Sequence, residues 1–301
     1  MITRRHVRIR VVQTYYSTLI NSIQQDHAVE LLTNVLHQAY QLLYIEISLL
    51  MKILKIIDFK TEKISQSKTP SNPLLNQYSA LGKNPFLRFI SQHSQLNQII
   101  ISNNIRFWNQ HNKTIENLID KLLNSQPFND YITFQNPSED QHRKLLIYLF
   151  TDIIAGSENL QEIYQDYSMS FTDDLPLVNT YLLKSIKRIK LDDSSSLIIS
   201  IPSDQTRDIR FAKALLKKTF VHREQIVKHY NESVKNWAID RLATLDTAIL
   251  NVSIAELLYF PEIPKKVTIN EYVDIAKDYS TEKSGMFING ILDSLMKKYL
   301  N

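Results

Sequence analysis

The stretch Ile263–Asp293, IPKKVTINEYVDIAKDYSTEKSGMFINGILD, decides the fold class of this chain. It predicts two consecutive helices. Thr268 is followed three residues later by Glu271, which is the spacing of a capping box, so we expect the first helix to begin near Thr268. This helix is expected to end near Tyr279, and a final helix is expected over about residues 281–299.

Glycine usage in the chain favours helices over tight turns. The 301 residues include only four glycines, whereas hairpins and tight turns need glycine for positive φ. Two of the four, Gly285 and Gly290, fall inside the final predicted helix, where each costs roughly 1 kcal/mol relative to alanine. Close helix packing and room for a ligand beside the backbone both explain them.

Apolar residues recur at helical spacing on both sides of this stretch. Leu242, Leu245, Ile249 and Val252 follow steps of three, four and three, which places them on one helical face. The segment 3–24 has the same kind of periodicity. We therefore predict an all-α protein built as a helical bundle.

Composition and motifs exclude several classes of function. The chain has no cysteine, so disulfides, thiolate metal sites and cysteine nucleophiles are excluded, and a cytoplasmic location is expected. The most apolar stretch, residues 42–59, is interrupted by charged residues and is too polar for a membrane span. The motifs G-x-G-x-x-G, G-x-x-x-x-G-K, H-E-x-x-H and G-x-S-x-G are missing, so we expect no enzyme, no cofactor and no metal site.

Three segments resemble the NusB family. Arg4, Arg5 and Arg8, followed by VQTYYS (Val12–Ser17), resemble the arginine-rich opening of the family and its VQALYS pattern. The run NWAIDRLATLDTAILNVSIAELL (Asn236–Leu258) is similar to the core helix pair of the family. The stretch quoted first contains elements that resemble the family signature V-x-I-N-E, A-K and F-x-N-G-x-L-D almost without gaps.

The resemblance covers the two ends of the chain, at about residues 3–24 and 208–299. It implies a NusB-like helical RNA-binding domain made of residues 1–25 and 207–301. Residues 26–206 would form a helical insertion of unknown role. Neither end shows enough apolar face to be stable alone, so we expect them to pack into one bundle.

The basic N-terminus is the first candidate site. Arg4, Arg5 and Arg8 fall on one face of the predicted helix, and cations in a first turn oppose the helix dipole. A solvated helix end would explain them, but the resemblance implies that they contact RNA. Single-stranded RNA is held by charge along its backbone and by bases stacked on aromatic rings. The resemblance therefore adds Lys283 and Phe287 to this RNA-binding set, although Phe287 also fits a core position.

The resemblance also implies a protein partner. Tyr16 and Asp246 align with family positions that contact the ribosomal protein NusE. A core tyrosine and a solvated helix acid are the alternative interpretations. Because Leu245 and Ile249 define the apolar face of their helix, we expect Asp246 at its edge, near Tyr16 on an exposed surface.

The expected function follows from the resemblance. NusB-family proteins are transcription antitermination factors that bind the single-stranded boxA element of ribosomal RNA leaders together with NusE, on the transcribing RNA polymerase complex. One alternative is a protein–protein scaffold on the same fold that does not bind RNA. Another is an RNA-binding accessory related to the N-terminal domain of ribosomal RNA cytosine methyltransferases. We do not expect the methyltransferase itself, whose catalytic domain needs a cysteine.

Overall fold

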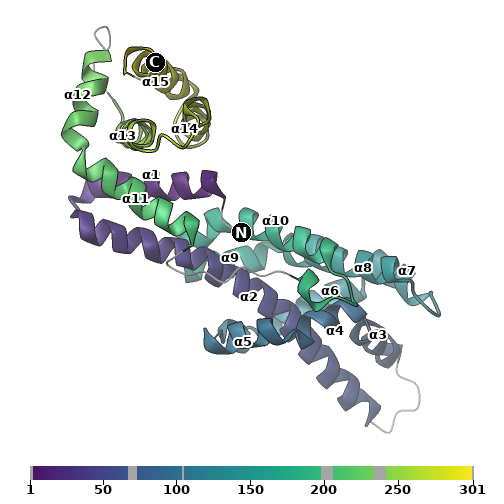
Figure 1. Ribbon diagram of the computed structural model, residues 1–301. Coiled ribbons are helices and arrows are strands. Elements are labelled where there is room, and N and C mark those ends of the chain that lie inside the picture. Colours follow the sequence, from purple (N-terminus) through teal and green to yellow (C-terminus); the bar gives the residue numbers. More distant parts are fainter. Residues whose placement is uncertain (1–2, 67–72, 104, 198–205, 234–241, 300–301) are drawn as a thin grey trace. The chain divides into compact units, whose positions relative to one another are not determined.

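The computed structural model of the protein describes residues 3–66, 73–103, 105–197, 206–233 and 242–299 (Figure 1). These residues form α-helices joined by short connections, with brief 3-10 and π segments and one isolated β-bridge between Lys190 and Asp193. The prediction of an all-α fold is therefore confirmed. No helix in the described ranges has the length and uninterrupted apolar sequence needed to cross a membrane.

The chain divides into two compact units. We call Ile2–His37 together with Pro202–Asn301 the bundle unit, and Gln38–Ile201 the insertion unit. The expected boundary after residue 25 falls at the start of α2 (Gln25–Ser65), whereas the division between the two units falls inside this continuous helix, between His37 and Gln38. Buried residues every three or four positions, including Leu32, Leu36 and Leu43, explain its continuity.

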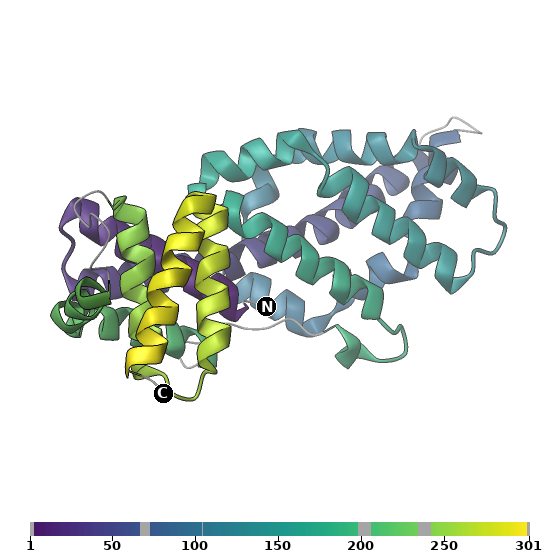
Figure 2. The same ribbon diagram turned by 90° about the horizontal axis from the view of Figure 1, so that it is seen from above.

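The bundle unit combines the N-terminal helix with the last third of the chain. Its helices, besides the start of α2, are α1 (Arg4–Asn21), α11 (Arg207–Val221), α12 (Arg223–Ser233), α13 (Thr244–Tyr259), α14 (Lys265–Tyr279) and α15 (Glu282–Tyr299). Helix α1 packs against α11 and α13, and α13 packs against α14. Helices α13, α14 and α15 lie side by side, and α14 and α15 pack along most of their length (Figure 2).

Helix α13 is the centre of this unit. Every residue from Ala248 to Leu257 is buried, including the polar Asn251, Ser253 and Glu256. The prediction of a single apolar face is therefore too narrow, because this helix is covered on all sides. A helix surrounded in this way forces its polar side chains to find partners inside the protein.

The starts of α1 and α14 differ in how they are capped, and the start of α14 is not where it was predicted. Thr3 caps α1, because its hydroxyl oxygen accepts a hydrogen bond from the His6 amide at 3.1 Å. The expected capping box at Thr268 is wrong: α14 begins at Lys265 after Pro264, and Thr268 is buried inside the first turns. The hydroxyl of Thr268 is instead used in a contact with α13, described below.

The segment that follows Thr206 forms two helices rather than one, because α11 ends at Val221 and α12 begins at Arg223. Trp237 lies outside the described residues. The polar segment 61–85 contains the end of α2 and the whole of α3 (Pro73–Gly82). Its prolines are compatible with helices, because Pro73 and Pro85 occupy first-turn positions, where no backbone donor is needed.

The insertion unit is built on the C-terminal part of α2. It contains α3, α4 (Pro85–Gln92), α5 (Ser94–Ser102), the 3-10 helix Phe107–Gln110, α6 (Asn112–Leu123), α7 (Gln126–Ile132), α8 (Glu139–Tyr148), the π segment Leu149–Ile154, α9 (Glu158–Tyr167), α10 (Met169–Arg188) and the 3-10 turn Ser194–Ser196. Helix α8 packs against α4, α7 and α10, and α9 packs against α10.

A cluster of aromatic rings fills part of the insertion unit's core. Phe107 and Trp108 pack around Tyr164, and Tyr164 in turn contacts Phe171. The carboxyl group of Glu46, only 1% exposed, lies in the same interior. Burial raises the pKa of Glu46 to about 7, and the Tyr164 hydroxyl acts in the opposite direction.

Candidate functional site

Helix α1 presents the three predicted arginines in its first two turns. Because successive residues of a helix turn by about 100°, Arg4, Arg5 and Arg8 leave it in related but different directions. The structure places them in three distinct environments, with exposed side-chain fractions of 32%, 35% and 4% respectively.

Arg8 points into the bundle unit and is held by Glu256 of α13. Its Nε and Nη2 atoms donate to both carboxylate oxygens at 2.8 to 3.1 Å. Its Nη1 atom lies 3.6 Å from a carboxylate oxygen of Glu271 in α14. The expected single basic face therefore does not include Arg8, because its guanidinium is buried and used by carboxylates. This position favours a structural role for Arg8, and its contact with RNA stays a prediction.

Glu256 is the centre of a buried polar network. The Thr268 hydroxyl donates to Glu256 Oε1 at 2.9 Å, and the Tyr272 hydroxyl donates to Oε2 at 2.9 Å. Together with Arg8, these donors satisfy both oxygens of a side chain that has no exposure. The network joins α1, α13 and α14, so it determines how the N-terminal helix sits on the rest of the unit.

The network changes the proton affinities of its members. Burial alone lowers the pKa of Arg8, but the hydrogen bonds and charge of Glu256 outweigh it, so the pKa is raised. Burial, and then the negative charge of Glu256, raise the pKa of the Tyr272 hydroxyl. Arg8 therefore stays charged and Tyr272 stays neutral at any physiological pH.

Arg4 lies at the contact between α1 and α11. Its Nε atom is 3.4 Å from a carboxylate oxygen of Asp208, and its guanidinium carbon is 4.0 Å from the centre of the Phe211 ring. Burial lowers the pKa of Arg4, and the charge of Asp208 opposes this only in part. About a third of the Arg4 side chain remains exposed.

Arg5 extends along the surface of α14 and meets three carboxylates. The distances from its guanidinium nitrogens are 2.8 Å to Asp278, 3.7 Å to Asp274 and 3.9 Å to Glu271. These acids are spaced by three and four residues, so they form one stripe on α14. We call Glu271, Asp274 and Asp278 the acidic stripe. It lowers the positive potential that Arg5 offers to an anion.

Lys283 and Phe287 lie in the first turns of α15, just after the α14–α15 turn. Lys283 is exposed and Phe287 is half-buried. Four residues apart on a helix, the two side chains are neighbours on one face. Arg5 reaches Asp278 near the end of α14, five residues before Lys283. The half-buried position of Phe287 leaves part of this residue accessible.

The two residues predicted to contact a partner differ in exposure. Tyr16 is half-buried on α1. The expected edge position of Asp246 is wrong, because this side chain is only 7% exposed in the first turn of α13. Its Oδ2 atom accepts a hydrogen bond from the Ser284 hydroxyl of α15 at 2.8 Å. Its Oδ1 atom has no hydrogen-bond partner among the described residues.

Sequence reasoning missed Glu256, Thr268 and Tyr272 as members of the network. One signal could have found Glu256, because a carboxylate within the otherwise apolar run of α13 requires a buried partner. Thr268 and Tyr272 are four residues apart and therefore share the face of α14 toward α13. The sequence did not indicate which of the N-terminal arginines completes the network.

Comparison with known proteins relates the C-terminal part of the chain to a family. The model of the NusB family matches residues 183–297. The protein "Transcription antitermination protein NusB" of Methylacidiphilum infernorum is 51% identical over 96 residues, which are 32% of this chain and 66% of the relative. The protein of the same name from Finegoldia magna is 45% identical over 94 residues, which are 31% of this chain and 69% of the relative.

A solved structure of T. maritima NusB is also similar, with 24% identity and a TM-score of 0.30, and covers 55% of this chain and 94% of that chain. The chain spans about two thirds of the length of the curated relatives it matches. The Finegoldia magna relative is well above 30% identical, and this chain covers more than two thirds of its length. The chain belongs to the NusB family.

Proposed function

We propose that this protein is a transcription antitermination factor that binds boxA-type single-stranded RNA together with NusE, as part of the transcribing RNA polymerase complex. The observation that carries this proposal is family membership, because the relatives that match about a third of the chain are named transcription antitermination proteins. On this proposal the protein performs no chemistry and acts by binding.

The proposed RNA contacts lie at the N-terminal end of α1 and the start of α15. Arg4 and Arg5 are each about one third exposed, and Lys283 is exposed. These three cations supply charge for the phosphate backbone, and the accessible part of Phe287 offers a surface on which a base can stack. Arg8 supports this surface indirectly, since its ion pair with Glu256 holds α1 in place.

The proposed contact with NusE uses Tyr16 and Asp246. A buried carboxylate oxygen without a hydrogen-bond donor is costly, and Asp246 Oδ1 is in that state among the described residues. Because this oxygen is buried, a donor from a bound partner reaches it only when the side chains around it move. Tyr16 offers an amphipathic ring of the kind enriched at interfaces.

The deciding experiment is a titration of short boxA-type RNA with and without NusE, repeated at several salt concentrations. Each arginine that neutralises a phosphate changes the slope of log affinity against log salt by ~0.7. The double variant Arg4→Ala, Arg5→Ala should therefore bind RNA less tightly and with a shallower slope. Phe287→Ala should lose roughly 1 to 3 kcal/mol of binding with little change in slope.

The matched control is Arg223→Ala, which removes an exposed arginine from α12. It should leave both affinity and slope close to those of the unmodified protein. For the partner, Asp246→Asn should weaken NusE binding without weakening RNA binding by the isolated protein. Circular dichroism must show each variant to be folded before its affinity is interpreted.

One observation favours a second candidate function, a protein scaffold that does not bind RNA. The three N-terminal arginines are all paired with carboxylates of the same unit, so their charge is already compensated. On this alternative, NusE binding persists and RNA binding is absent. NusE binding by a protein that shows no saturable binding of boxA-type RNA at any of the salt concentrations would establish it over the RNA-binding proposal.

A further inference from the structure

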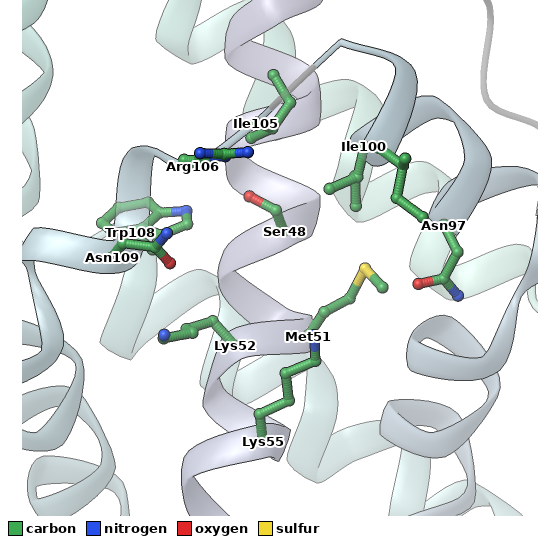
Figure 3. A pocket seen from close by; sticks show the side chains of 11 residues that line it. Ser48, Met51, Lys52, Lys55, Asn97, Ile100, Ile105, Arg106, Trp108 and Asn109 are labelled. Atoms are coloured by element: carbon green, nitrogen blue, oxygen red, sulfur yellow. The ribbon is translucent and has the colours of Figure 1, made fainter.

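The insertion unit contains a pocket of about 230 Å³ between α2, α5 and the segment Ile105–Asn109 (Figure 3). Its cationic and polar side chains come from all three segments: Ser48, Lys52, Lys55, Asn97, Arg106 and Asn109. Figure 3 shows Arg106 at one end, above Ser48, and Lys52 and Lys55 at the other end. Asn97 and Asn109 lie on opposite sides.

The positive charge of the pocket is uncompensated in the part of the chain that the structure describes. No ion pair joins Lys52, Lys55 or Arg106 to a described carboxylate, whereas other cations of the same unit are paired. Lys60 lies 3.2 Å from Glu116, and Arg143 lies 2.7 Å from Glu139. Three cations around one concave site repel one another, and a bound anion removes this repulsion.

The uncharged polar groups of the pocket determine which neutral groups of an anionic ligand can bind there. The side-chain nitrogen of Asn97 donates to the backbone oxygens of Ser91 and His93, at 2.9 and 3.1 Å, so its carbonyl oxygen remains available to a ligand. The Ser48 hydroxyl donates to the Ile45 carbonyl at 2.8 Å and therefore also keeps an acceptor lone pair. Both groups accept hydrogen bonds, so they suit a hydroxyl or amine of the ligand rather than its anion.

The remaining walls are apolar and include Met51 and Trp108, both nearly fully buried. The indole nitrogen of Trp108 donates to the Ile45 carbonyl at 2.8 Å, so this wall is held rigidly against α2. The pocket thus combines cations for a phosphate, acceptors for hydroxyl groups and an apolar surface. A volume of about 230 Å³ accommodates a phosphorylated sugar but not a large cofactor.

We propose that this pocket binds the phosphate and sugar of one nucleotide. Cations that approach from both ends match the oxygens of a phosphate, which point in several directions, better than the planar oxygens of a carboxylate. The nucleotide is either free or part of a single-stranded RNA. This site is separate from the surface proposed on the bundle unit and does not depend on it.

The test is calorimetric titration of the full-length protein with 5′-UMP, uridine, inorganic phosphate and the tetranucleotide of uridine. We expect 5′-UMP to bind, uridine to bind at least about tenfold more weakly, and inorganic phosphate to bind in between. Tetranucleotide binding that is tighter than 5′-UMP binding assigns the site to an RNA strand, and equal binding assigns it to a free nucleotide.

The variants Lys52→Gln and Arg106→Gln should each weaken 5′-UMP binding about tenfold or more. Lys63→Gln is the matched control, because it removes an exposed lysine from the same helix outside the pocket and should leave binding within about twofold. Asn109→Glu, an exposed substitution that keeps the fold, should abolish binding by placing a carboxylate among the cations.

Three outcomes overturn the proposal. The first is 5′-UMP affinity equal to that of uridine. The second is affinity unaffected by Lys52→Gln, Arg106→Gln and Asn109→Glu in variants that circular dichroism shows to be folded. The third is a polyglutamate peptide that binds as tightly as 5′-UMP with the same sensitivity to these variants, which assigns the pocket to an acidic protein segment. Loss of boxA binding by the arginine variants of α1 leaves the pocket proposal unaffected.

Discussion

Arg8 and Glu256 form a bidentate ion pair with donor–acceptor distances of 2.8 to 3.1 Å, although 248 residues separate them in the sequence. Both side chains are buried, with exposed fractions of 4% and 0%. The insertion unit occupies the chain between them. A charge pair in the interior tolerates little movement, so it fixes the position of α1 on α13.

Removal of Arg8 should destabilise the bundle unit strongly. Arg8→Ala leaves the carboxylate of Glu256 buried without its cation, which costs roughly 3 to 5 kcal/mol in free energy of unfolding. Arg8→Lys should recover only part of this, because an ammonium group cannot reproduce the bidentate geometry. Urea unfolding followed by circular dichroism measures both.

The double variant Arg8→Met, Glu256→Gln is the control for this prediction. It removes both charges and should recover more than half of the stability lost by Arg8→Ala. Arg5→Ala removes a neighbouring, more exposed arginine and should cost at most about 1 kcal/mol. An Arg8→Ala protein as stable as the Arg5→Ala protein would show that the buried ion pair does not hold α1 in place.

Neutralisation of two residues of the acidic stripe should strengthen the proposed RNA binding. Asp274 and Asp278 lie 3.7 and 2.8 Å from Arg5 and compete with phosphate for its guanidinium. The variant Asp274→Asn, Asp278→Asn should raise RNA affinity by roughly twofold to fivefold, which corresponds to the weak energy of exposed ion pairs. A filter-binding titration at low salt measures this change.

The variant Glu224→Gln, Glu262→Gln removes the same charge from exposed positions on α12 and beside α14. It serves as the control for a general effect of net charge. An equal gain in affinity for both double variants would mean that RNA responds to the overall charge of the protein and not to Arg5.

The stability of the insertion unit should fall as pH rises toward 8. Burial raises the pKa of Glu46 to about 7, above its value of about 4.5 in an unfolded chain. The stabilisation from its protonated form is therefore complete below pH ~4.5 and is lost as pH rises through about 7. The total change is on the order of 3 kcal/mol.

Glu46→Gln keeps the shape of the side chain and removes its ionisation. It should be more stable than the unmodified protein at pH 8 and equally stable at pH 4.5. Thermal unfolding of both proteins across this pH range measures the difference. Parallel pH profiles for the two proteins would show that Glu46 does not ionise with a raised pKa.

The two glycines of α15 should respond differently to alanine. A Cβ atom at Gly290 has no atom within 4 Å, so Gly290→Ala should stabilise the helix by roughly 0.5 to 1 kcal/mol. At Gly285 a Cβ atom lies 2.9 Å from Cγ of Lys277, so that side chain must move. Gly285→Ala should therefore be the less stable of the two variants in urea unfolding.

The same two variants distinguish close helix packing from room for a ligand as the reason for these glycines. Close helix packing explains Gly285, because α14 faces it directly. If Gly290→Ala raises stability and lowers RNA affinity, the open space at Gly290 serves a ligand. If it raises stability alone, the glycine has no role in binding.

Local patterns in the sequence determined the helical class and the family of this protein. Apolar residues at steps of three and four predict helices directly, because side-chain periodicity depends only on near neighbours. The cap at Thr3 follows from the same local rules. The capping box expected at Thr268 shows their limit, since that hydroxyl hydrogen-bonds to Glu256 across the helix interface.

The tertiary structure alone decided what each N-terminal arginine does. Arg4, Arg5 and Arg8 are equivalent in the sequence, yet one contacts an aromatic ring, one meets the acidic stripe and one is buried against Glu256. Likewise, Lys52, Lys55 and Arg106 form one pocket only because α2 and the segment after α5 come together. The electrostatic interactions of a charged side chain depend on its burial and on partners that are distant in the chain. Burial and these contacts exist only after the helices have packed.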